Sequence, residues 1–68
     1  MTAETKTALA NLRQRIDGID AELNGLLEQY EAGLVSAAHV RVRELTLKAR
    51  RETFQNTFNS LLGSIKHF

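Results

Sequence analysis

The sequence predicts an all-α protein in which two long helices form an antiparallel hairpin. Apolar residues in the first half recur alternately every three and four positions, as on one face of a helix. Gly33 follows this pattern, and the 68-residue chain contains no proline. We therefore expect a single domain with a helix over about residues 3–32, a turn over 33–36 and a helix over about 37–62.

The first helix carries a heptad seam, made of Leu9, Leu12, Ile16, Ile19, Leu23, Leu26 and Tyr30. Its repeat averages 3.5 residues, so the stripe stays aligned only when the helix packs against another helix. Gly33 is suited to end this helix because glycine readily adopts the left-handed conformation of a C′ residue. The seam predicts a packing surface rather than a reaction.

The second helix is less regular. The hydroxyl of Ser36 can cap its first turn, and Gly63 can end it. Its apolar residues form two stripes, Ala38, Val42, Leu45 and Ala49, followed by Phe54, Phe58, Leu61, Ile65 and Phe68. Two arrangements are open: the first stripe packs within the hairpin while the phenylalanines enter a subunit interface, or both belong to one wide stripe buried in a bundle.

A hairpin of two helices cannot surround a core, because each helix has only one neighbour. The chain has no cysteine, so neither a disulfide nor a thiolate zinc site can compensate. We therefore expect self-association, most simply a homodimer with a four-helix core. The residues expected to hold the oligomer are Leu12, Ile16, Ile19, Leu23, Leu26, Phe54 and Phe58.

Charge separates the two halves. Six acidic and three basic residues precede Leu34, whereas two acidic and six basic residues follow, for a net charge of +1. Fold-back of the chain at Gly33 would bring the two sets together, although exposed pairs contribute at most about 1 kcal/mol each. Five cations crowd into eleven residues of the second helix and are expected to face a partner: Arg41, Arg43, Lys48, Arg50 and Arg51. An acidic protein surface is the expected partner.

Nucleic acid is the alternative partner, because clustered cations also bind phosphates. Two features weigh against it. Glu44 and Glu52 lie inside the cluster, and the isoelectric point near 8.2 is lower than is usual for such modules.

Signs of catalysis are few. His39 and His67 are far apart and have no partners at metal-ligand spacing, so we expect no metal and no cofactor. Ser36 lacks a Gly-x-Ser-x-Gly setting. The N-terminal residues lack a basic segment followed by an apolar run, and no stretch approaches the roughly 18 apolar residues of a membrane span. A cytoplasmic protein that does not contact membranes is expected.

Three segments resemble known families. The segment Glu31-Ala32-Gly33-Leu34-Val35-Ser36, followed by a helix with Val40-Arg41, Arg50-Arg51, Phe54 and Leu61-Leu62, resembles the oligomerisation region of small subunits of phage DNA-packaging terminases. The DNA-binding helix-turn-helix of that family is not found in these 68 residues. This resemblance implies a phage-type helical oligomer.

The seam of the first helix, together with Arg13, Asp17, Asp20 and Leu27, is similar to the first helix of all-helical chorismate mutases. In that family the arginine that matches Arg13 contacts a substrate carboxylate. The similarity covers under a third of the chain, and the later catalytic groups are missing. A third segment, Ser36-Ala37-Ala38-His39 with Arg41 and Glu44-Leu45-Thr46, is similar to the Hha family of small helical proteins.

The function expected from the sequence is that of a small non-enzymatic interaction protein, encoded by a phage or mobile element, which binds a host or structural protein as an inhibitor or adaptor. The alternative is a nucleic-acid-binding or DNA-packaging accessory protein that uses its basic second helix. An enzyme similar to chorismate mutase is the least favoured interpretation.

Overall fold

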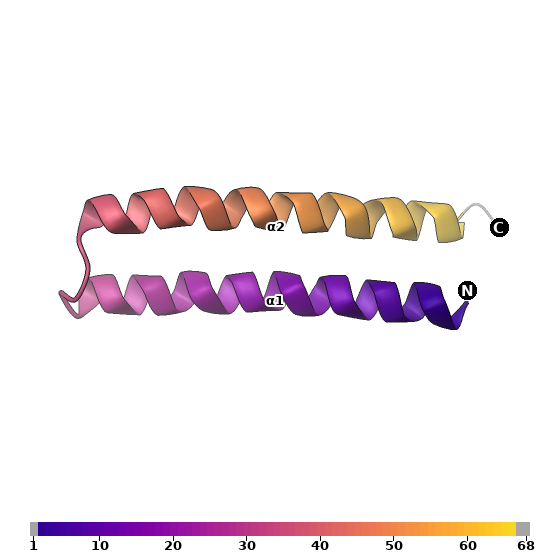
Figure 1. Cartoon of the computed structure of the whole chain (residues 1–68), viewed down its shortest axis with the longest axis horizontal. Coiled ribbons are helices and arrows are strands. Elements are labelled where there is room, and N and C mark those ends of the chain that lie inside the picture. The colour runs from indigo at the N-terminus through magenta and orange to yellow at the C-terminus, as the bar shows by residue number, and fades with distance from the viewer. Residues whose placement is uncertain (1, 67–68) are drawn as a thin grey trace.

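The computed structural model describes residues 2–66 and contains two helices joined by a short turn (Figure 1). Helix α1 spans Ala3–Glu31 and helix α2 spans Ala37–Lys66. The helices run antiparallel side by side, so α1 begins at the end of the molecule where α2 ends. The resulting rod measures 51 × 16 × 13 Å. Over these residues, the prediction of an all-α chain of two helices is confirmed.

Local capping explains where α1 begins and ends. The Thr2 hydroxyl accepts a hydrogen bond from the Thr5 amide at 3.1 Å. At the other end Gly33 has a φ of 76°. The Leu34 amide donates to the Gln29 carbonyl at 2.9 Å, and the Gly33 amide donates to the Tyr30 carbonyl at 3.0 Å. These two bonds form a Schellman motif, which confirms the predicted role of Gly33.

The predicted start of α2 is confirmed, but its predicted end is wrong. Ser36 Oγ accepts a hydrogen bond from the His39 amide at 3.1 Å, as a cap should. Gly63 does not end the helix, which continues to Lys66. Leu62 and Ile65, on either side of Gly63, are half-buried, so continuation of the helix keeps apolar surface out of water.

The core is small and lies between the two helices. Among the described residues the buried apolar side chains are Ile16, Ile19, Leu26 and Leu47. Leu47 is the most buried, with 1% of its surface exposed. Half-buried apolar residues extend this contact along the rod on both helices: Leu9, Leu12, Leu23, Val40, Phe54, Phe58, Leu61, Leu62 and Ile65.

The expected packing of the first stripe of α2 is wrong. Val42 and Leu45 are 67% and 66% exposed, and Ala38 and Ala49 are exposed as well. The reason is Leu47, which follows Leu45 by two residues and therefore points about 200° away, toward α1. The two stripes consequently do not merge into one wide buried face.

The inward face of α2 is instead the one that carries the phenylalanines. Val40, Leu47 and Phe54 are spaced seven residues apart, and Phe58 follows one turn later. These residues are buried or half-buried in the hairpin itself. Phe68, also assigned to this stripe, lies outside the described residues.

Substitution of the two neighbouring leucines in α2 should have opposite consequences. We expect Leu47→Ala to lower the free energy of unfolding by about 2–5 kcal/mol, because it removes the best buried side chain. Leu45→Ala is the matched control and should change the stability by less than about 0.5 kcal/mol. Urea denaturation followed by circular dichroism measures both, and equal losses would contradict the orientation of α2.

Two glycines inside α1 should be replaceable with a gain in stability. A Cβ added at Gly18 or Gly25 would meet no atom within 4 Å. Because glycine costs roughly 1 kcal/mol relative to alanine in a helix interior, Gly18→Ala and Gly25→Ala should each stabilise the protein by about that amount. Gly33→Ala should destabilise it, since its positive φ strains an alanine. Thermal melting of the three variants tests whether each substitution raises or lowers the stability. A lower melting temperature for Gly18→Ala or Gly25→Ala would show that a Cβ at that position meets neighbouring atoms.

Candidate interaction surface on the second helix

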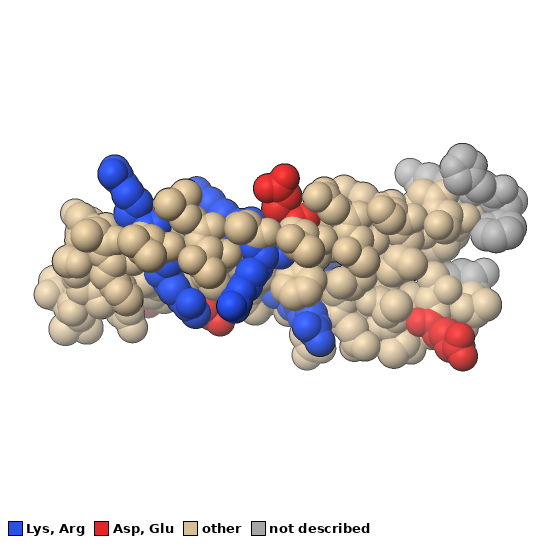
Figure 2. Space-filling view, turned by 45° about the horizontal axis from the view of Figure 1, so that its top comes forward, with Lys and Arg blue, Asp and Glu red and all other residues tan. Residues whose placement is uncertain are grey.

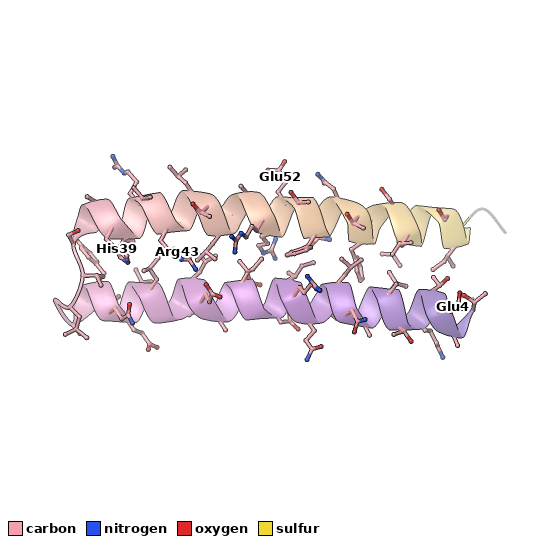
Figure 3. The ribbon with its side chains drawn as sticks, viewed as in Figure 1. Glu4, His39, Arg43 and Glu52 are labelled. Atoms are coloured by element: carbon pink, nitrogen blue, oxygen red, sulfur yellow. The ribbon has the colours of Figure 1, made fainter. Side chains whose placement is uncertain are left out.

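Two arginines of α2 form ion pairs with α1. Arg43 Nη2 donates to Glu22 Oε2 at 3.2 Å, and Arg51 Nε donates to Asp20 Oδ1 at 2.9 Å. All four side chains are about half-exposed, so each pair contributes at most about 1 kcal/mol. Figure 3 shows Arg43 on the side of α2 that faces α1. The predicted attraction between the acidic and basic halves therefore occurs within the hairpin.

The other three predicted cations lie elsewhere on α2. Lys48 pairs with Glu44 one turn before it. Arg41 and Arg50 are exposed, and neither forms an ion pair with any described residue. Arg41 and Lys48 share one edge of the helix because they are seven residues apart, whereas Arg50 points about 200° away from Lys48. The five cations therefore do not form one continuous face.

An exposed apolar strip lies between these two basic edges. We call it the outer stripe; it consists of Ala38, Val42, Leu45 and Ala49. The stripe covers three helical turns, about 16 Å, on the side of α2 opposite α1. In Figure 2 the Lys and Arg side chains gather over the half of the molecule next to the turn. Glu52 points away from α1 just beyond the stripe (Figure 3).

Shallow grooves accompany the contact between the helices. One, of about 190 Å³, is lined by Leu23, Asn24, Leu26, Leu27, Val40, Glu44 and Lys48. A larger one, of about 530 Å³, is lined by Asp20, Leu23, Lys48, Arg51, Glu52, Gln55 and Asn56. Leu27, at the edge of the first groove, is 52% exposed. The first groove is thus a further place where apolar surface of the hairpin remains uncovered.

The seven residues predicted to hold an oligomer meet along the contact between α1 and α2. Ile16, Ile19 and Leu26 are buried there. The other four are half-buried, namely Leu12, Leu23, Phe54 and Phe58. The guanidinium of Arg15 lies 5.6 Å from the centre of the Phe54 ring and covers part of it. A single chain therefore already provides a partner for most of this apolar surface.

The described residues do not form a metal centre. No group of three His, Cys, Asp or Glu side chains in residues 2–66 is arranged to hold a metal ion. His39 borders a groove with Glu22 and Arg43, on the α1 side of α2 (Figure 3). His67, the other histidine considered from the sequence, lies outside the described residues.

Sequence reasoning identified the cations but missed the two apolar residues between them. Both arrangements left open by the sequence bury Val42 and Leu45, either within the hairpin or in one wide stripe of a bundle, because their spacing suits a helix face. The seven-residue spacing of Val40, Leu47 and Phe54 is the signal that could have placed them correctly, since it defines the opposite face as the inner one.

No family model, curated protein or solved structure matches this chain. Within residues 2–66, neither helix is apolar over enough of its length to cross a membrane.

The ion pairs within the hairpin should have a measurable but small effect on stability. We expect Arg51→Gln to lower the free energy of unfolding by about 0.5–1 kcal/mol at low salt, because Asp20 loses its partner. Arg41→Gln removes one positive charge from the same helix without breaking an ion pair and should change stability by less than about 0.5 kcal/mol. Denaturation at low and high salt measures the free energy of unfolding of both variants. Equal losses in the two variants would argue against the ion pair of Arg51, and so would an Arg51→Gln loss that is as large in high salt as in low salt.

Proposed function

We propose that this protein is a small non-enzymatic interaction protein that self-associates and docks on an acidic protein surface through the outer face of α2. The observation that carries this proposal is the outer stripe. Val42 and Leu45 are each about two-thirds exposed, and Arg41, Lys48 and Arg50 occupy the edges beside them. Exposed apolar patches with polar rims are typical of protein interaction sites.

The two kinds of residue supply different parts of the binding energy. The branched side chains of Val42 and Leu45 lose contact with water when a partner covers them, which favours binding. Arginines at the edges attract carboxylates, steer the encounter and fix the orientation of the partner. A protein of this size acts by covering a surface of its partner, as an inhibitor or adaptor does.

Self-association is supported by the small core. With four buried apolar side chains among the described residues, the hairpin keeps much of its apolar surface in contact with water. Any association of folded chains stabilises the fold, because the unfolded chain does not take part. The resemblance to the oligomerisation region of phage terminase small subunits also favours an assembly, and with it an origin in a phage or mobile element.

Nucleic-acid binding is the second candidate function. It is favoured by Arg41 and Arg50, which are exposed and form no ion pair with the described residues. Their opposite edges and the nearby Glu52 argue for few simultaneous phosphate contacts. Binding through two or three phosphates would give a logarithmic salt slope of only about −2 to −3.

Removal of the outer stripe should abolish association but preserve the fold. We expect the melting temperature of the wild-type protein to rise with protein concentration, and that of the Val42→Ser/Leu45→Ser variant to be independent of concentration. Leu34→Ser is the matched control, because Leu34 is 74% exposed in the turn, away from the stripe.

The melts should be paired with light scattering, with and without a short DNA duplex at low salt. A wild-type mass that rises with protein concentration and does not change when DNA is added supports the proposed function as an interaction protein. A mass that rises only with DNA favours the second candidate function. Identical melts and masses for the wild type and the double variant would contradict the assignment of the outer stripe.

A further inference from the structure

We infer that the outer stripe of α2 packs against the outer face of α1 of a second copy, so that the chains assemble head to tail. This inference rests on the proposed function, in which the outer face of α2 is a docking surface. It goes further by naming the occupant of that surface and the symmetry of the contact.

The outer face of α1 differs in kind from the outer stripe of α2. Ala10, Asp17, Ala21 and Glu28 follow one another at intervals of seven, four and seven residues, and all four are exposed. Ala21 follows the buried Ile19 by two residues and so points away from α2. Asp17 and Glu28 make this face acidic, and Ala10 and Ala21 are small, whereas the longer side chains of Arg13 and Gln14 lie one turn before Asp17.

The two outer faces are complementary in charge. Asp17 and Glu28 form no ion pair with any described residue, and the same holds for Arg41 and Arg50. A head-to-tail contact would bring Asp17 and Glu28 of one copy near the edge of α2 that carries Arg41 and Lys48 in the other, while Arg50 lies on the opposite edge. Charge complementarity of this kind favours one partner and one orientation over others.

The faces also match in shape. Val42 and Leu45 are three residues apart and project from α2, whereas Ala21 lies between Gly18 and Gly25 and leaves a shallow place on α1 where such side chains can pack.

Symmetric contacts are less favourable. A contact between two α2 outer faces would bring Arg41, Lys48 and Arg50 of both copies together, and a contact between two α1 outer faces would oppose Asp17 and Glu28. The head-to-tail contact avoids both repulsions. It differs from the four-helix homodimer expected from the sequence, which uses the residues between the helices.

A head-to-tail contact leaves one free face at each end. The outer faces of α1 and α2 point in opposite directions, so every added copy offers a new α2 face, and growth stops only when the rotation closes a ring. Each contact involves one helix face per copy and is small beside the roughly 1,200–2,000 Å² of stable interfaces. We therefore expect a mass that increases gradually with concentration.

Two complementary variants test this arrangement. Val42→Ser/Leu45→Ser disables the α2 face, and Asp17→Arg/Glu28→Arg disables the α1 face. All four positions are exposed, so both variants should keep the helix content of the wild type. Light scattering should find each variant monomeric at concentrations where the wild type has at least twice the monomer mass. An equimolar mixture should form a heterodimer and nothing larger, because only one pair of intact faces remains.

Other outcomes separate this inference from the proposed function. If the α1 variant associates as the wild type does while the α2 variant is monomeric, two α2 faces meet in a symmetric contact, and the inference is overturned while α2 remains a docking surface. A mixture of two monomeric variants that stays monomeric also overturns the inference. A wild-type protein that is monomeric at every concentration overturns the inference and the self-association in the proposed function, and leaves only docking on another acidic protein. If the α2 variant associates as the wild type does, both the inference and the proposed function fail.

Discussion

The contact between Leu47 and the seam of α1 determines which surfaces of this protein are free. Leu47 is almost completely buried, and it borders the same groove as Leu26 of α1. Once this side of α2 faces α1, helical geometry places Leu45 and Val42 on the opposite side, in solvent. The outer stripe, its basic edges and the docking role proposed for it all follow from this rotation of α2.

The same contact brings two of the four arginines of α2 within reach of acidic residues of α1. Arg43 and Arg51 lie near enough to α1 to bond Glu22 and Asp20, and so help to hold the hairpin. Arg50 shares the edge of Arg43, seven residues before it, and Arg41 lies on the opposite edge; both are exposed, and neither forms an ion pair with a described residue. Arginines that pair within the hairpin are less available to other molecules, so the number of cations in the sequence overstates how many the proposed partner could contact.

Local signals were sufficient to predict much of the fold. Ser36 and Gly33 act through bonds to residues within a few positions, so their roles follow from residue type and place in the chain. The prediction that Gly63 ends α2 was wrong because a glycine ends a helix only when nothing favours its continuation, and burial of Ile65 favours continuation here. The inner face of α2 was not predicted, because two apolar stripes with helical spacing compete and only packing against α1 selects between them. The pairing of each cation could not be predicted either, since it depends on the register of the two helices.

The most direct test of this account is the rate at which a thiol reagent modifies single cysteines introduced at positions 45 and 47. The wild-type chain has no cysteine, so each variant reports on one site. We expect Leu45→Cys to react rapidly in dilute protein and more slowly as concentration rises and a partner covers the outer stripe, whereas Leu47→Cys reacts slowly throughout. Slow modification of Leu45→Cys in dilute protein would contradict the orientation of α2. A rapid rate that stays unchanged while the protein associates would contradict the role of the stripe in association.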